Sequence, residues 1–122
     1  MANNNIVEMR LNPAPLKKIK AGQKKYELRL YDKKRRKLNK GDFIEFTNTE
    51  NDQEQLMVKV EELKLFESFE ELYGELSLLE FGYSQGDLST ASPKDMQSYY
   101  SKSQQEKYGV VGIRLSLLDS KA

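Results

Sequence analysis

Hydrophobic residues alternate with polar ones in several short stretches of the chain, as they do in strands with one buried face. The alternation is clearest around Leu28, where tyrosine and leucine take every second position and mostly charged residues take the positions between. Four other stretches have a strand-like pattern and are bounded by turn-forming residues. The pattern therefore predicts at least five strands, at residues 6–11, 24–32, 43–47, 55–65 and 108–117.

Helix signals occur at three places between these strands. The first is an asparagine cap with prolines at 12–15, and Gly22 suits the end of that helix. The second is a capping box at 68–71 ahead of an apolar stripe. A third helix is expected to start with a cap at 92–95 and run to Glu106. Because the connections are short, we expect an α+β fold: a small, mostly antiparallel β-barrel with about three short peripheral helices.

The alternation also predicts which side chains share a face. Along the last strand it places four aliphatic side chains in the core: Val111, Ile113, Leu115 and Leu117. Gly112 in this strand permits a close backbone approach or a bulge. Along residues 24–32 it separates Tyr26, Leu28 and Leu30 from Lys25, Glu27, Arg29 and Tyr31. The polar face either belongs to a solvated edge strand or, beside a helix–glycine corner, lines a cleft.

Charge is distributed unevenly along the chain. Residues 17–40 hold twelve of the 20 Lys and Arg residues but only two of the 19 acidic ones, Glu27 and Asp32. A total charge of +1 therefore hides a region of about +10, which is suited to neutralising phosphates. Residues 45–80 hold eleven acidic residues against two lysines. That segment is either a protein-interaction face or, more simply, a solvated surface.

Composition excludes several kinds of chemistry. The 122 residues suit one domain, and the absence of Cys and His excludes disulfides, thiolate nucleophiles, His/Cys zinc sites and Ser-His-Asp triads. We expect no metal and no cofactor. No apolar run approaches the ~20 residues of a membrane span, and the N-terminus lacks the pattern of a signal peptide. The expected location is cytoplasmic, without membrane attachment.

Four stretches together resemble the ASCH domain family. They are residues 11–22, the run Gly22-x-Lys24-x-x-Glu27-x-Arg29, residues 40–46 and the closing 99–113. The resemblance covers residues 6–118 as a single domain, with 1–5 as a flexible lead and 119–122 as a tail. ASCH domains are similar to PUA domains, in which a β-barrel and helices enclose a cleft. The resemblance implies binding of RNA or a nucleotide in a positively lined cleft.

The resemblance also implies an enzymatic alternative. Some small members are amidohydrolases that deacetylate N4-acetylcytidine, and ribonuclease activity has been ascribed to the family. The deacetylating members use a lysine at the position of Lys24, a threonine three residues later and a later glutamate. Here Glu27 stands at the threonine position, and Glu80 is the best match for the later acid. A catalytic group of Lys24, Glu27 and Glu80 is therefore expected if the protein is a hydrolase.

For the binding alternative, we expect single-stranded or looped RNA, whose unpaired bases can enter a cleft. Lys24 and Arg29 would hold a phosphate or a base edge, Glu27 would accept from a cytosine amino group, and one tyrosine would stack on a base. Lys24 is expected to border solvent and to contribute little to stability. The full set of expected binding residues is Lys24, Glu27, Arg29, Tyr31, Lys33, Lys34, Arg35, Arg36, Tyr99 and Tyr100.

Overall fold

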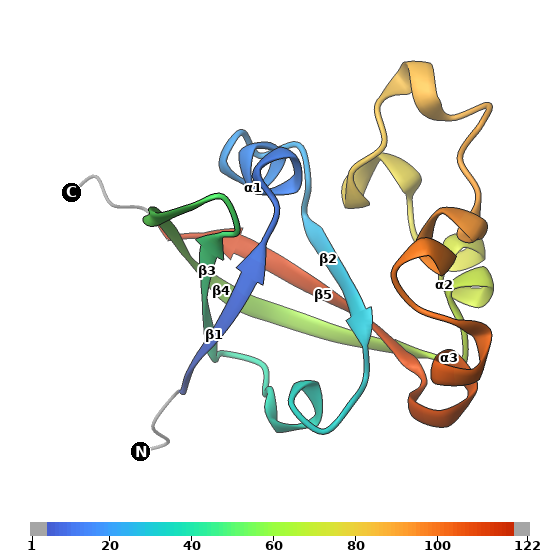
Figure 1. The fold of residues 1–122 in the computed structure, drawn as a ribbon, viewed down its shortest axis with the longest axis horizontal. Coiled ribbons are helices and arrows are strands. Elements are labelled where there is room, and N and C mark those ends of the chain that lie inside the picture. The colour runs from blue at the N-terminus through green and yellow to red at the C-terminus, as the bar shows by residue number, and fades with distance from the viewer. Residues whose placement is uncertain (1–4, 119–122) are drawn as a thin grey trace.

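The computed structural model describes residues 5–118 and contains one curled five-stranded sheet (Figure 1). In the order of the sheet, the strands are β1 (Ile6–Leu11), β3 (Phe43–Asn48), β4 (Asn51–Phe66), β5 (Val110–Leu117) and β2 (Tyr26–Leu30). Only β1 and β3 are parallel; the other neighbouring pairs are antiparallel. This confirms the expected α+β class, with the sheet closing part way into a half-barrel. The tail expected at 119–122 lies outside the described residues, and so does the expected lead at 1–5 apart from Asn5.

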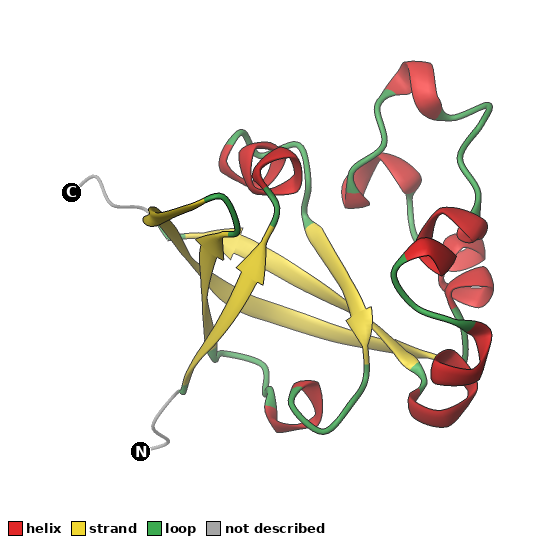
Figure 2. Cartoon of the chain, in the orientation of Figure 1, coloured by secondary structure: helices red, strands yellow, loops and turns green. Residues whose placement is uncertain are grey.

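The helices are short, and most gather on one side of the sheet (Figure 2). Within the described residues, three are α-helices: α1 (Pro13–Lys20), α2 (Phe69–Glu75) and α3 (Lys102–Tyr108). Four are 3₁₀ helices: η1 (Arg35–Lys37), η2 (Leu78–Phe81), η3 (Gln85–Asp87) and η4 (Pro93–Ser98). We call residues 69–108 the helical arm. None of the helices within residues 5–118 is long and apolar enough to span a membrane.

The single helix expected from Ser92 to Glu106 is wrong. The chain leaves η4 at Tyr99, and α3 begins after a new cap at Ser101. The Ser101 hydroxyl accepts a hydrogen bond from the Gln104 backbone at 3.1 Å, and the Gln104 side chain accepts one from the Ser101 backbone at 2.9 Å. This second capping box starts a separate helix inside the expected one.

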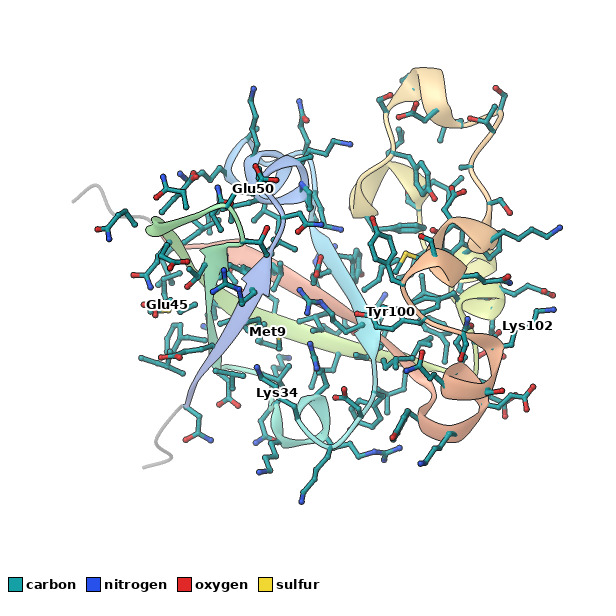
Figure 3. The ribbon with its side chains drawn as sticks, viewed as in Figure 1. Met9, Lys34, Glu45, Glu50, Tyr100 and Lys102 are labelled. Atoms are coloured by element: carbon teal, nitrogen blue, oxygen red, sulfur yellow. The ribbon has the colours of Figure 1, made fainter. Side chains whose placement is uncertain are left out.

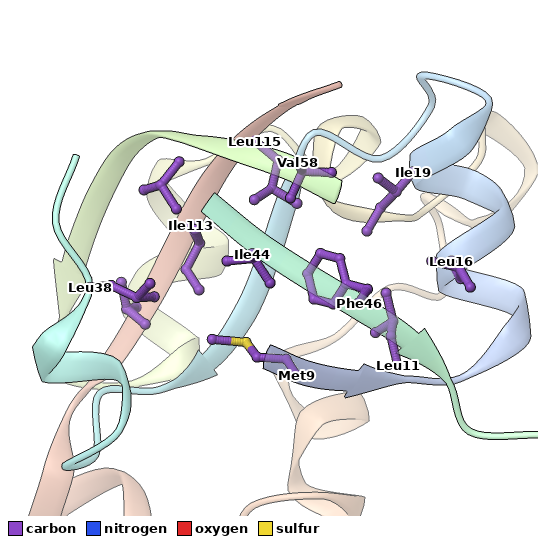
Figure 4. Close-up of a cluster of buried hydrophobic side chains, with 12 residues drawn as sticks. Met9, Leu11, Leu16, Ile19, Leu38, Ile44, Phe46, Val58, Ile113 and Leu115 are labelled. Atoms are coloured by element: carbon purple, nitrogen blue, oxygen red, sulfur yellow. The ribbon is translucent and has the colours of Figure 1, made fainter. Parts of the chain in front are cut away.

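Two apolar clusters lie on opposite faces of the sheet. Figure 4 shows the first, in which strand residues inside the curl pack against Leu16 and Ile19 of α1. The second joins β2 to the helical arm. An added Cβ at Gly112 would lie 3.0 Å from the Leu76 side chain, so the close neighbours of this glycine are side chains and not the backbone. Leu117, expected in the core, is instead 44% exposed, because β5 ends there at the margin of the sheet.

The two edge strands of the sheet, β1 and β2, are connected by a side chain. The Arg29 guanidinium on β2 donates from Nη2 to the backbone carbonyl of Arg10 on β1, at 2.9 Å. Curling of the sheet brings these edges near each other, although they stand at opposite ends of the strand order. The half-barrel therefore has an open seam, and the helical arm lies beside it.

Candidate functional site

A cleft of about 1000 Å³ lies at this seam, between the half-barrel and the helical arm. The half-barrel wall comes from β1, α1 and β2, and the wall opposite comes from the helical arm. In Figure 3, Tyr100 of the arm is seen beside β2. The lining residues are Arg10, Leu11, Asn12, Lys18, Lys24, Glu27, Leu28, Arg29, Tyr73, Phe81, Gly82, Tyr83, Asp87, Thr90, Lys94, Asp95, Met96, Ser98, Tyr99 and Tyr100.

Three charged residues of β2 and the turn before it form a buried triad on the half-barrel wall. Glu27 and Arg29 lie on one face of β2 because side chains alternate along a strand, and Lys24 precedes the strand. Lys24 Nζ is 3.3 Å from Glu27 Oε1, and Arg29 Nε donates to Glu27 Oε2 at 2.6 Å. The exposed fractions of these side chains are only 8% for Lys24, 7% for Glu27 and 13% for Arg29. The polar face of the strand is therefore not a solvated edge.

Partners from distant parts of the chain complete the triad. Lys24 Nζ donates to the Phe81 carbonyl of the helical arm at 3.0 Å, and Arg29 bonds to β1 as described above. The expectation that Lys24 is lined by solvent is wrong, because the arm and Glu27 enclose it, while its expected small contribution to stability stays a prediction. Lys18 of α1 donates to the next carbonyl, that of Gly82, at 2.6 Å. Two lysines thus hold the turn after η2 against the half-barrel.

The electrostatics of the triad favour an anionic ligand. Burial would raise the pKa of Glu27, but the charges of Lys24 and Arg29 and their hydrogen bonds outweigh it and lower that pKa. Burial lowers the pKa of Lys24, and Glu27 opposes this effect. Burial would also lower the pKa of Arg29, but Glu27 raises it. Two buried basic groups share one carboxylate, and a buried charge without a counterion is costly. An added anion would balance the excess positive charge.

The wall opposite is rich in aromatic side chains. The Tyr83 hydroxyl donates to Asp95 Oδ2 at 2.5 Å and lies 2.8 Å from the Tyr73 hydroxyl. Because the proton of Tyr83 is directed to Asp95, Tyr73 is the donor in the second bond. Burial and the bond to Asp95 raise the pKa of Tyr83. The ring of Phe81 packs edge-on against Tyr73, with ring centres 4.9 Å apart. Tyr99, at 66% exposed, also borders the cleft.

Sequence reasoning did not identify several of these residues. Tyr73 belongs to a helical stripe that indicates core, and Tyr83 lies in a Gly/Ser-rich connection. Neither residue lies at a helical or strand spacing from Lys24, Glu27 or Arg29, so no local sequence pattern connects them with the triad. Arg10 and Lys18 were also missed, although Lys18 belongs to the basic run. The dense aromatic content of residues 66–83 was the only local signal.

The structure brings five of the expected binding residues to the cleft and leaves the others outside its lining. The five are Lys24, Glu27, Arg29, Tyr99 and Tyr100. Tyr31 instead packs against the first apolar cluster, and the Arg36 guanidinium lies 4.5 Å from the centre of its ring. Arg35 forms an ion pair with Asp32 at 3.1 Å, while Lys33 and Lys34 are exposed beyond the end of β2.

Glu80, expected in a catalytic group, does not reach the triad. Its carboxylate lies 3.7 Å from Arg114 Nη1 and is not part of the cleft lining. Only the backbone of its neighbour Phe81 reaches Lys24. Each carboxylate oxygen of Glu27 faces one basic group, Lys24 or Arg29, so the expected acceptor for a cytosine amino group also serves the triad. Within residues 5–118, no three or more His, Cys, Asp or Glu side chains group as a metal site.

Comparison with known proteins agrees with this architecture. The family model of the ASCH domain matches residues 8–119. The hypothetical protein PH0355 is 33% identical, with 93% of this chain and 99% of that chain covered and a TM-score of 0.76. Protein PF0455 from Pyrococcus furiosus is 32% identical, with 93% and 98% covered and a TM-score of 0.69.

A more distant structure supports the fold alone. It is that of ASCH from Zymomonas mobilis, 14% identical, with a TM-score of 0.62 over 91% of this chain and 66% of that one. No curated protein sequence matches the chain. The curled sheet, the helices beside its seam and the family match over nearly all of the described residues lead to one conclusion. The chain belongs to the ASCH domain family.

Proposed function

We propose that residues 6–118 act as a single RNA-binding domain, whose cleft takes a nucleotide of single-stranded or looped RNA. The observation that carries this proposal is the buried triad, with its excess of positive charge, facing aromatic side chains across the cleft. A nucleotide combines an anionic phosphate with a flat base. The two walls therefore offer what the two parts of a nucleotide require.

The triad offers hydrogen-bond donors to a phosphate. Both carboxylate oxygens of Glu27 face basic groups of the triad, and those basic groups retain N–H donors that can bind a ligand. Among the described residues, none accepts a hydrogen bond from Arg29 Nη1, and Lys24 has a third ammonium proton beyond its bond to Phe81 and its ion pair with Glu27. Charge-assisted bonds of this kind are about twice as strong as neutral ones.

The aromatic wall suits an unpaired base. Bases in a duplex are already stacked, whereas those in single strands and loops can be splayed onto aromatic side chains. The two acidic residues on this wall are committed to the fold of the arm. Asp87 accepts bonds from the backbone and hydroxyl of Ser84, and Asp95 accepts from Tyr83 and Ser92. Both carboxylates therefore have structural partners, which limits their repulsion of a phosphate.

The hydrolase and protein-interaction alternatives have weaker support. Lys24 and Arg29 lower the pKa of Glu27, which makes its carboxylate a weaker base for activating water, and Glu80 lies elsewhere. General acid–base catalysis needs a group of suitable pKa within hydrogen-bond reach of the reacting proton. For the acidic segment 45–80, no feature of the described residues points to a protein partner. We therefore propose binding, without catalysis, as the function of the cleft.

The proposal predicts where and how RNA binds. Titration of the isotope-labelled 14.2 kDa protein with short unpaired RNA should shift the amide resonances of Lys24, Glu27 and Arg29. A hairpin stem of the same composition should bind more weakly, because its bases are not free to enter the cleft. Chemical shift changes confined to residues outside the cleft, or equal binding of stem and single strand, would overturn the proposal.

Tyr99 provides a test of base stacking. Tyr99→Ala should weaken binding of unpaired RNA by about 1–3 kcal/mol, roughly 5- to 150-fold, since an exposed stacking surface is lost. The urea midpoint should stay close to that of the wild type, because the side chain is mostly exposed. Tyr99→Phe is the matched control and should retain affinity. Equal affinity of the alanine and phenylalanine variants would exclude stacking at this position.

A further inference from the structure

The fold divides the basic run of residues 17–40 between the two ends of β2. Helix α1 lies at one end and the segment 33–37 at the other (Figure 1). At the α1 end, Lys18 donates to the Gly82 carbonyl, and Lys20 forms an ion pair with Glu54 at 2.7 Å. At the other end, the exposed residues Lys33, Lys34 and Lys37 have no acidic partner within 4.0 Å among residues 5–118. Lys17 and Lys25 at the α1 end are likewise exposed without an acidic partner among the described residues, so positive charge lies at both ends of β2, and the 33–37 segment carries three such lysines in five residues.

The 33–37 segment is held in place by packing. Asp32 accepts from the Arg35 backbone at 3.1 Å, and Leu38 is buried in the first apolar cluster. Arg36 stacks over Tyr31 and donates from Nη2 to the Tyr108 carbonyl at 3.1 Å. The lysines therefore project from an ordered segment. A preorganised surface loses less conformational entropy on binding than a flexible loop.

The helical arm adds positive charge that is distant in the sequence. The bond between Arg36 and Tyr108 brings the end of α3 against the segment, and the Tyr31 backbone donates to the Gly109 carbonyl at 2.9 Å. Lys107 is exposed there, with its ammonium 5.2 Å from the centre of the Tyr108 ring. We call Lys33, Lys34, Lys37 and Lys107 the basic platform.

The basic platform adjoins the cleft through β2. Tyr100 lines the cleft beside Arg29. Burial raises the pKa of the Tyr100 hydroxyl, and the charges of Arg29 and Arg35 both oppose that rise. The geometric link is β2 itself, which carries Glu27 and Arg29 of the cleft wall and ends at Leu30, three residues before the 33–37 segment. Figure 3 shows Lys34 beyond the end of β2 that lies near Tyr100.

We propose that the basic platform holds the phosphates that follow on one side of the nucleotide bound in the cleft. The ligand is then a polynucleotide chain, which leaves the cleft between Arg29 and Tyr100 and runs over the 33–37 segment. This inference rests on the proposed function and extends it, because a free nucleoside or mononucleotide would leave the platform unused. Phosphate contacts of this kind give affinity without sequence preference.

The test uses probes whose register is fixed. Each of the trinucleotides A3, C3, G3 and U3 is titrated first, and the tightest binder is extended by four abasic sugar–phosphate units on its 5′ or its 3′ side. Abasic units carry phosphates but cannot place a base in the cleft. We expect extension on one side to tighten binding at least tenfold at 100 mM salt. Extension on the other side should change the affinity less than twofold.

Matched variants locate the effect. The triple variant Lys33→Gln/Lys34→Gln/Lys37→Gln should abolish the gain in affinity. It should also make the slope of log K against log salt less steep by about 2, since each single-strand phosphate contact contributes about 0.7 to that slope. The affinity for the unextended trinucleotide, whose few phosphates reach less of the platform, should fall much less than the affinity for the extended probe. Lys17→Gln/Lys20→Gln/Lys25→Gln, at three exposed lysines of the same run near the other end of β2, should retain the gain.

The outcomes separate this inference from the proposed function. Trinucleotide binding at the triad with no gain from either extension, or with equal gains from both, would overturn the platform and leave the cleft as a nucleotide site. A gain that survives in the Lys33/Lys34/Lys37 variant would also overturn it. Trinucleotides that fail to shift the triad resonances would remove the proposed function and this inference together.

Discussion

Replacing Glu27 with alanine is expected to lower the free energy of unfolding by about 3–5 kcal/mol, because it leaves two buried basic side chains without their shared carboxylate. Lys24 and Arg29 cannot reach solvent easily, since the Phe81 and Arg10 carbonyls hold them in place. The melting temperature should fall by roughly 10–20 °C. Urea and thermal unfolding of the purified variant measure both quantities.

An exposed ion pair provides the control for this result. Asp52 lies 3.3 Å from Arg10, with 77% of the Asp52 side chain and 58% of the Arg10 side chain exposed. Asp52→Ala should therefore cost less than about 1 kcal/mol. Glu27→Gln, which keeps the volume of the side chain, should fall between the two. A Glu27→Ala variant with the urea midpoint of the wild type would mean that solvent reaches both basic groups and that the triad is not truly buried.

Lys24→Met is expected to weaken binding of the best trinucleotide by about 2–5 kcal/mol, or roughly 30-fold and more, since it removes one buried charged donor from the proposed phosphate contact. Methionine retains most of the apolar stem that packs in the cleft and leaves Glu27 paired with Arg29. The loss of stability should therefore be smaller than for Glu27→Ala. Isothermal calorimetry measures the affinity, and urea unfolding measures the stability.

The adjacent lysine is the matched control for the binding effect. Lys25 is exposed and is not part of the cleft lining. Lys25→Met removes the same charge from the chain and should change the affinity less than threefold. Equal losses in the two variants would mean that general electrostatic attraction, and not a contact at the triad, accounts for binding. Full affinity in Lys24→Met would exclude Lys24 from the site.

Local sequence patterns predicted most of the secondary structure. Alternation identified the five strands. The capping box at 68–71 marked the start of α2, and Gly22 marked the turn after α1. The helix expected from Ser92 to Glu106 failed because helix signals continue through Tyr99, while the competing cap at Ser101 starts α3. Two adjacent helices with compatible patterns look like one long helix when only propensity and spacing are considered.

The candidate site was only partly predictable. Alternation placed Glu27 and Arg29 on one face, but it could not tell whether that face was solvated or buried. The answer depends on carbonyl groups from Arg10 and Phe81, which reach the triad from β1 and from the helical arm. Glu80 illustrates the converse case. It is one residue from Phe81 in the chain, yet its carboxylate pairs with Arg114 outside the cleft.

The sequence by itself determined the family, the α+β class, the strand and cap positions and the strongly basic character of residues 17–40, because these depend on local periodicity, turn chemistry and composition. Only the tertiary structure decided that the triad is buried, that the aromatic residues of the arm face it, and that the basic run is divided between two ends of β2. Those features require segments far apart in the chain to meet. The curl of the sheet and the packing of the arm bring them together, and no local pattern encodes those distances.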